Sequence, residues 1–227
     1  MPASGQFQRA PRTRGAQIRE ALEHVRVSRG GQPMATRTPE PVQLAEQSHA
    51  EWLAAYNGSA MQTGSAEALS HTTIYGIESW RRADCSDDYV RAHPYAQAKG
   101  IASAGGAGRA SVTGQIVGHN ADCIVIPIRD LRTGKVVAVQ CVNPVGAKQS
   151  FGKVSGNALL LGNTLDKSVG WFVTEGWASA YSVVFHHCGG NACCAAAFGK
   201  GNLKTVAEVI AEIYEPVTLV IIEEQDR

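Results

Sequence analysis

Acidic residues follow two short apolar runs near the C-terminal end, and they are the residues best suited to carry out chemistry. Glu175 follows the run Trp171–Thr174, and Glu224 and Asp226 follow the run Val217–Ile222. Glu224 and Asp226 are two residues apart, so an extended backbone places both carboxylates on one face. Clustered carboxylate oxygens favour Mg²⁺ or Mn²⁺, and Mg²⁺ in turn binds substrate phosphates. The pattern therefore predicts a divalent metal site for phosphate chemistry.

Both apolar runs are predicted to be buried strands, because short β-branched and aromatic runs bounded by Gly or Pro suit strands better than helices. A third apolar run, Ala192–Phe198, and two helix-like stretches, 177–187 and 201–215, lie between them. This alternation predicts parallel strands, whose C-terminal ends all open on one edge of the sheet. Ligands commonly bind at that edge of an open α/β sheet. The three acidic residues are therefore expected to meet there.

A small antiparallel subdomain is predicted ahead of these strands. Residues 123–128 and 135–142 are predicted to form a hairpin with its turn at Gly134. Glycine suits this position because it readily adopts the positive φ that hairpin loops require. Residues 158–161 are predicted to be a third strand of the subdomain, and Asn143–Lys153 is predicted to be a loop.

Five short segments narrow the interpretation further. They are, in chain order, His93–Ile101, Ile126–Asp130, Gly134–Gln140, Gly146–Phe151 and Glu175–Ala180. In this order they resemble segments of the Toprim-domain DNA primases of plasmid, phage and conjugation type. Five segments in one order are more specific than any one of them. The resemblance covers about residues 93–227, the C-terminal three-fifths of the chain.

The resemblance implies an α/β fold with a Toprim-like parallel sheet and flanking helices. It also implies an enzyme, a nucleotidyltransferase that synthesises RNA primers on a single-stranded DNA template in phage or plasmid DNA replication. Ribonucleoside triphosphates would be its substrates and Mg²⁺ or Mn²⁺ its cofactor, with metal ions stabilising the attacking and leaving oxygens. A replicative helicase or another replication protein would be a partner.

The resemblance assigns catalytic roles to the acidic residues. Glu175 is expected to bind metal or to act as a general acid or base on the reacting oxygen. Glu224 and Asp226 fill the acid-x-acid position of the family and are expected to bind the metal with Glu175. Glu224 departs from the family pattern, in which the first acid of this pair is usually Asp, and its longer side chain would place the metal differently.

Phosphate binding is assigned to a glycine and three cations. Gly176 follows Glu175 and leaves room for a phosphate to approach the backbone. Lys148, Lys153 and Arg129 are the candidate cations for contacts with nucleotide or template phosphates. His93 is expected to cap or pack a turn and to take no part in catalysis.

Two other functions remain open from the sequence. Nucleic-acid cleavage uses the same metal site in Toprim nucleases, although the upstream primase-like segments argue against it. A non-catalytic nucleic-acid-binding or assembly module with a degenerate Toprim core is the other alternative. It is motivated by Glu224 in place of Asp and by the end of the sequence at Arg227, soon after the acid pair. The sequence is accordingly expected to be either a fragment of a longer polypeptide or a reduced relative that needs a partner.

Charge is distributed unevenly along the 227 residues, whose net charge is only +1. Residues 1–38 hold seven Arg against two Glu, a local net charge of +5. A basic arm over 1–40 is therefore predicted to be disordered and to meet nucleic acid. Residues 41–122 are predicted to be a helical and irregular region. Residues 123–227 are predicted to hold the β subdomain and a C-terminally incomplete Toprim domain.

Incomplete motifs and the hydropathy pattern exclude several protein classes. The sequence has no apolar segment of membrane-spanning length and no secretory leader, so the protein is expected to be cytoplasmic, without membrane contact. Gly199-Lys200 lacks the rest of a Walker A loop, and Gly106-Ala107-Gly108 lacks the third Gly of a dinucleotide-binding loop. Cys188, Cys193 and Cys194 lack zinc-finger spacing, so they are predicted to lie at a helix end and in a buried strand.

Overall fold

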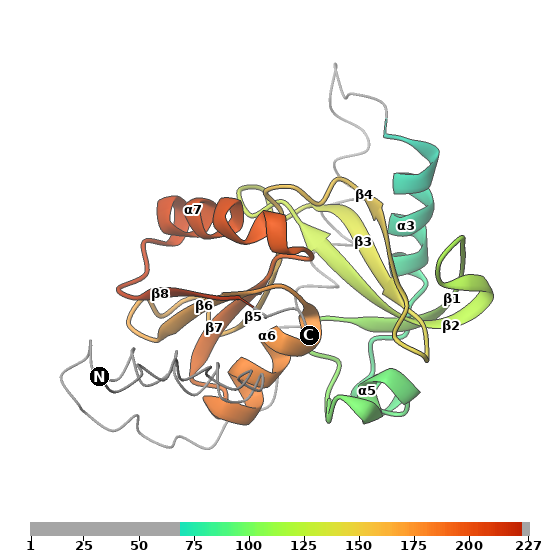
Figure 1. The fold of residues 1–227 in the computed structure, drawn as a ribbon, viewed down its shortest axis with the longest axis horizontal. Coiled ribbons are helices and arrows are strands. Elements are labelled where there is room, and N and C mark those ends of the chain that lie inside the picture. The colour runs from blue at the N-terminus through green and yellow to red at the C-terminus, as the bar shows by residue number, and fades with distance from the viewer. Residues whose placement is uncertain (1–68, 224–227) are drawn as a thin grey trace, which may run out of the picture.

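A computed structural model describes residues 69–223 of the chain, as two neighbouring sheets with helices around them (Figure 1). Residues 1–68 and 224–227 lie outside the described part. The predicted basic arm and the acid pair Glu224 and Asp226 therefore lie outside the described residues.

The first sheet is antiparallel and contains the predicted hairpin. Its strands pair in the order β1-β2-β3-β4, and helix α3 (His71–Arg81) packs against the sheet. The hairpin of β2 and β3 is confirmed, with Gly134 at a φ of 70° donating its N–H to Asp130 O at 2.8 Å. Two short helices, α4 (Asp87–Arg91) and α5 (Pro94–Ala98), precede β1. The strands are β1 (Gly108–Gly114), β2 (Gly118–Arg129), β3 (Val136–Val142) and β4 (Lys148–Gly152).

Two parts of this sheet differ from the sequence prediction. Lys148–Gly152, predicted to lie in a loop, is strand β4 and pairs antiparallel with β3. Strand β1 and the first residues of β2 lie in the stretch before residue 123 that was predicted to be irregular. The edge strands β1 and β4 are mostly exposed or half-buried, and in β4 only Phe151 is buried. Edge strands of this kind carry little hydrophobic periodicity, so the pattern does not reveal them.

The second sheet is mixed, with the strand order β5-β7-β6-β8. Strand β6 runs parallel to both β7 and β8, which confirms the parallel arrangement predicted for these three apolar runs. Strand β5 runs antiparallel to β7, so the sheet is mixed, and the predicted parallel arrangement holds only for β6, β7 and β8. Strand β5 was wrongly assigned to the antiparallel subdomain. The strands are β5 (Leu159–Gly162), β6 (Gly170–Thr174), β7 (Ala192–Ala196) and β8 (Leu219–Ile222).

Helices cover both faces of the second sheet, as Figure 1 shows. Helix α6 (Trp177–Tyr181) continues into a π-helix, η1 (Ser182–His187), on one face. The 3₁₀ turn η2 (Lys200–Asn202) leads into α7 (Leu203–Tyr214) on the other face. Side chains alternate between these faces, so Phe172 packs with α6 while Trp171 and Val173 pack with α7. The two predicted helical stretches are thus confirmed. None of the helices within residues 69–223 is long and apolar enough to cross a membrane.

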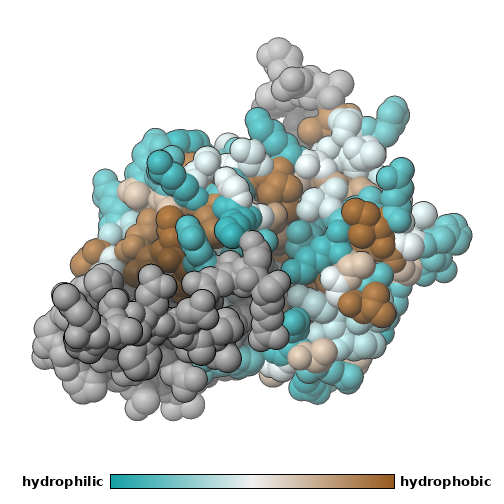
Figure 2. Space-filling view, viewed as in Figure 1, coloured by the Kyte–Doolittle hydropathy of each residue, from teal (hydrophilic) through white to brown (hydrophobic). Residues whose placement is uncertain are grey.

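The space-filling view shows hydrophilic side chains interspersed with hydrophobic areas, one between α7 and β8 and others over the first sheet (Figure 2). Strand β8 lies at one edge of the described sheet, and its Ile221 is 39% exposed. The hydrophobic area beside β8 therefore lies at the edge of the second sheet opposite β5.

Strand β2 connects the two sheets because both of its faces are buried. Cys123 and Val125 pack in the cluster under α3. Ile124 and Ile126 pack on the opposite face, in the cluster that contains residues of α5, α6 and β7. This two-sided burial explains the continuous apolar run in the sequence, which lacks the alternation of a half-buried strand.

The three cysteines lie where the sequence predicted them. Cys188 directly follows η1 and is buried. Cys193 and Cys194 are adjacent residues of the central strand β7, with no exposed surface. Burial raises the pKa of both thiols, so they remain protonated and serve as small apolar side chains.

The hydrogen bonds of Asn202 provide a test of what joins the end of β7 to the loop after β4. Its buried side chain donates to Ala197 O at 2.7 Å and accepts from Gly156 N at 2.8 Å, joining the end of β7 to the loop after β4. We expect Asn202→Ala to lower the free energy of unfolding by about 1–3 kcal/mol, because buried backbone groups lose their partners. Urea unfolding measures this. Asn163→Ala, which removes one bond in an exposed loop, is the control and should change stability by less than about 0.5 kcal/mol.

Candidate functional site

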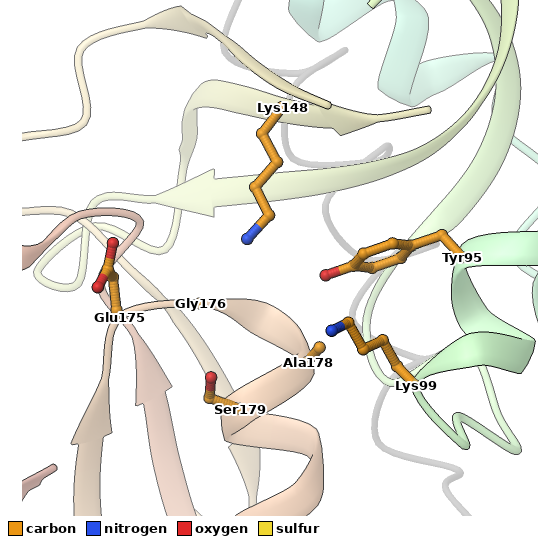
Figure 3. A pocket seen from close by; sticks show the side chains of 7 residues that line it. All are labelled: Tyr95, Lys99, Lys148, Glu175, Gly176, Ala178 and Ser179. Atoms are coloured by element: carbon orange, nitrogen blue, oxygen red, sulfur yellow. The ribbon is translucent and has the colours of Figure 1, made fainter. Parts of the chain in front are cut away.

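A pocket of about 120 Å³ lies between the two sheets (Figure 3). It brings together three of the segments that carried the family resemblance. One wall comes from α5, one from the start of β4, and one from the β6–α6 junction. The lining residues are Tyr95, Lys99, Lys148, Glu175, Gly176, Ala178 and Ser179.

Helix α5 supplies Tyr95 and Lys99. Pro94 occupies its first turn, where a residue without an N–H is tolerated. Tyr95 and Lys99 are four residues apart, which puts them on one side of the helix. The Lys99 Nζ lies 5.9 Å from the centre of the Tyr95 ring, within the range of a cation–π contact. Figure 3 shows the Tyr95 hydroxyl and the Lys99 amine directed into the same space.

His93 caps this helix, as the sequence led us to expect. The side chain is fully buried, and its Nδ1 accepts the Tyr95 N–H at 3.2 Å. Its Nε2 is 3.2 Å from Asp122 O, a carbonyl that can only accept. The neutral tautomer with the proton on Nε2 satisfies both contacts. Burial lowers the pKa of His93, which favours this neutral form.

An ion pair between Arg109 and Asp122 stabilises strand β2, whose Asp122 carbonyl contacts His93. Arg109 binds the Asp122 carboxylate with two N–H donors, at 2.8 Å from Nε and 2.7 Å from Nη2. The guanidinium also lies 4.4 Å from the centre of the Tyr89 ring in α4. Hydrogen bonding from Arg109 lowers the pKa of Asp122, so the carboxylate stays charged. The strands β1 and β2 are thereby tied to the helices that carry the pocket.

Glu175 and Lys148 lie on the opposite walls of the pocket. Glu175 directly follows β6 and is half-buried, and Lys148 is the exposed first residue of β4. A Cβ atom built on Gly176 would lie 3.7 Å from Lys148 Nζ, so the backbone beside Glu175 runs close to this ammonium group. Neither Glu175 nor Lys148 forms a side-chain hydrogen bond or ion pair with another residue of 69–223. Both charges therefore remain available to a ligand.

The other two predicted cations do not line the pocket. Arg129 ends β2 and donates from Nη1 to Gly134 O at 3.0 Å, in the hairpin turn. Burial lowers the pKa of its guanidinium. Lys153 is exposed in the loop after β4, where Asn157 Nδ2 donates to its backbone carbonyl. Phosphate binding by these two residues stays a prediction.

The predicted metal site is only partly within the described residues. Thr174 pairs with Ile222 in the parallel register of β6 and β8, so the chain leaves β8 at the edge where Glu175 lies. Glu224 and Asp226 come next in the sequence and lie outside the described residues. Within residues 69–223, no group of three or more His, Cys, Asp or Glu side chains could hold a metal ion. Glu175 alone does not make a metal site, so this prediction depends on the two later acids.

The sequence did not identify Tyr95, Lys99 and Ser179 as site residues. All three belong to segments that carried the family resemblance, and the i, i+4 spacing of Tyr95 and Lys99 after Pro94 was visible in the sequence. The missing information was which helix lies opposite Glu175, because that depends on the packing of α5 against β2.

Comparisons with known proteins find likenesses among solved structures. The primase fragment of the bacteriophage T7 primase-helicase protein matches with a TM-score of 0.47 and 18% sequence identity, over 76% of this chain and 66% of that one. The chain thus spans slightly less than two thirds of that fragment. A bacteriophage T7 lagging-strand DNA polymerase with primase domains bound to an RNA/DNA hybrid and dTTP matches with a TM-score of 0.39 and 17% identity, over 54% of this chain and 60% of that chain. No protein-family model and no curated protein sequence matches.

The buried, neutral His93 predicts a pH dependence of stability. The pKa of His93 is lower in the folded protein than the value of about 6.5 in an unfolded chain. The unfolded chain therefore binds more protons as the pH falls through about 6.5, and the free energy of unfolding decreases, by up to about 1.4 kcal/mol at pH 5.5. Urea unfolding between about pH 7.5 and 5.5 measures this change, in a range where carboxylates remain charged.

His93→Asn should remove this contribution, because its amide can still cap α5 but does not titrate. The exposed His119 provides the control, and His119→Asn should leave the pH dependence as in the wild type. An unchanged pH dependence in His93→Asn would contradict the assignment.

Proposed function

We propose that the pocket binds the phosphates of a nucleotide and that the protein is a primase-like nucleotidyltransferase acting on single-stranded DNA. The observation that carries the proposal is the meeting of three primase-like segments at one pocket, through Tyr95 and Lys99, Lys148, and Glu175. These segments are far apart in the sequence. Their convergence supports a shared function better than any one of the motifs.

The charges of the pocket support phosphate as the ligand. Lys99 and Lys148 bring two ammonium groups to the pocket, against the one carboxylate of Glu175. A group with several negative oxygens can accept hydrogen bonds from both lysines. The side chains of Tyr95 and Ser179 line the same pocket. Gly176 has no side chain, so a phosphate can approach its backbone N–H.

In the proposed mechanism, two walls of the pocket bind the triphosphate and the third supplies the general base. Lys99 and Lys148 hold the triphosphate and offset the negative charge that develops on the leaving group. Glu175 accepts the proton of the attacking hydroxyl as a general base. The oxygen then attacks the α-phosphorus, the bond to the bridging oxygen breaks, and diphosphate leaves with its electron pair. In this proposal Arg129 and Lys153 take no part in the pocket.

Divalent metal is part of the proposal through Glu175, Glu224 and Asp226. A bound Mg²⁺ or Mn²⁺ would supply charge neutralisation at the phosphates. Glu224 and Asp226, two of these three ligands, lie outside the described residues.

A template-directed assay tests the proposed activity with labelled ribonucleotides, single-stranded DNA and Mg²⁺ or Mn²⁺. Glu175→Gln should lower kcat at least about 100-fold, because it removes the proposed general base and one of the proposed metal ligands. Lys148→Ala should raise the KM for nucleotide at least about tenfold, as expected for loss of a charge-assisted contact. The exposed Lys135 lies outside the pocket, and Lys135→Ala is the control that should behave as the wild type.

Three outcomes of this assay would contradict the proposal. Synthesis that survives Glu175→Gln unchanged would remove the proposed site. Nicking of DNA without added nucleotides would indicate a nuclease at the same site. Binding of single-stranded DNA with no product under any metal condition would indicate a non-catalytic module.

Thermal unfolding tests the metal separately from the activity. A metal ion that binds only the folded protein stabilises it, and at 100 times the Kd the melting temperature should rise by roughly 5–10 °C. Glu175→Gln and Asp226→Asn should each reduce this rise. Glu208→Gln, on the exposed surface of α7, should not. An equal rise in all three variants would contradict the assigned ligands.

A further inference from the structure

The segment that follows Lys99, Gly100–Gly105, is held by side chains from the helix that follows Glu175. His186 Nε2 donates to Gly100 O at 2.9 Å. Trp177 Nε1 donates to Gly105 O at 2.9 Å, at the other end of the segment. Both donors belong to the continuous helix formed by α6 and η1. The two walls of the pocket are therefore joined directly by side-chain contacts.

Tyr181 makes the central contact of this arrangement. Its buried hydroxyl accepts the Ala102 N–H at 3.1 Å and lies 2.9 Å from Ser103 Oγ. One phenol oxygen thus binds two consecutive residues of the segment. Gly105 has a φ of 52°, and a Cβ there would lie 2.7 Å from the Tyr181 ring, so the backbone passes directly against the aromatic ring.

The π-helix explains how one helix presents all three side chains to the segment. A π-helix has more residues per turn than an α-helix, so residues five apart lie on one side. Tyr181 and His186 are five residues apart, and their rings lie 5.5 Å from each other. In a continued α-helix, His186 would be rotated away from Tyr181.

We propose that Tyr181 is a positioning residue of the pocket, which fixes the Gly100–Gly105 segment and so holds Lys99 opposite Glu175. The fixed segment holds Lys99 in place because Lys99 caps the C-terminal end of α5 and directly precedes Gly100. The segment is held close to Glu175 because α6, which supplies the contacts, begins two residues after Glu175. The role of Lys99 in binding a ligand rests on the proposed function. The contacts that hold the Gly100–Gly105 segment do not depend on it.

The variant Tyr181→Phe tests the proposal in the full chain, because it removes the hydroxyl and keeps the ring. Tyr75→Phe is the matched control. The Tyr75 hydroxyl accepts the Thr113 N–H at 2.8 Å, a contact of the same kind in the first sheet and away from the pocket. Amide hydrogen exchange at Ala102 should accelerate at least about tenfold in Tyr181→Phe and remain unchanged in Tyr75→Phe. Unchanged exchange at Ala102 in Tyr181→Phe would overturn the proposal.

A double-mutant cycle with Lys99→Ala tests the route through Lys99, with calorimetric titration of ATP as the readout. Tyr181→Phe should raise the Kd for ATP about tenfold in the wild-type background and cause little further change once Lys99 is absent. Equal effects in both backgrounds would contradict positioning through Lys99, since a general loss of structure would act in either. If the wild type binds no ATP, the proposed function fails, and the exchange at Ala102 alone decides the role of Tyr181.

Discussion

The pocket depends on one packing constraint, the burial of strand β2 on both of its faces. Val125 packs under α3, while Ile124 and Ile126 pack with α5 and α6. Burial of each Ile contributes about 1.5–3 kcal/mol, more than the roughly 1 kcal/mol of an ordinary hydrogen bond. Apolar packing on one face of β2 therefore holds the first sheet against α5 and α6, which carry two walls of the pocket, and the third wall comes from β4 of the same sheet.

Polar contacts then orient the elements that this packing brings together. His93 ties the start of α5 to β2, and Arg109 neutralises the neighbouring Asp122 carboxylate. Tyr181 and His186 tie the segment that follows α5 to the helix formed by α6 and η1. These contacts act on backbone atoms at both ends of α5. Each is modest in energy, but together they leave the helix with one orientation, and ligand binding then needs little further ordering.

The electrostatics of the pocket follow from its position at the edge of two sheets. Lys148 begins an exposed edge strand, and Lys99 ends a short helix, so both ammonium groups can remain hydrated without a ligand. Glu175 stands at the C-terminal edge of the second sheet, where backbone turns leave open space. An anionic ligand therefore does not have to break an existing ion pair of Lys148 or Glu175 among the described residues.

The sequence by itself determined the local elements with strong periodicity and the residues between them. It predicted the β2–β3 hairpin, the three parallel strands β6, β7 and β8, both helical stretches between these strands, and the burial of Cys193 and Cys194. Each prediction rests on a continuous apolar run or on a residue such as Gly134 with a specific backbone preference. The motif order also singled out Glu175 and Lys148, which the structure brings to one pocket.

Only the tertiary structure decided which strands pair and which helix lies opposite Glu175. Strand β5 joined the second sheet, and β4 formed where the sequence indicated a loop, because strand pairing depends on contacts between distant residues. Tyr95 and Lys99 became pocket residues for the same reason. Their segment is placed by His93, Tyr181 and the buried faces of β2, and none of these contacts leaves a periodic signal in the sequence. Local preference specifies an element, whereas the meeting of two elements is specified by the surfaces that both of them bury.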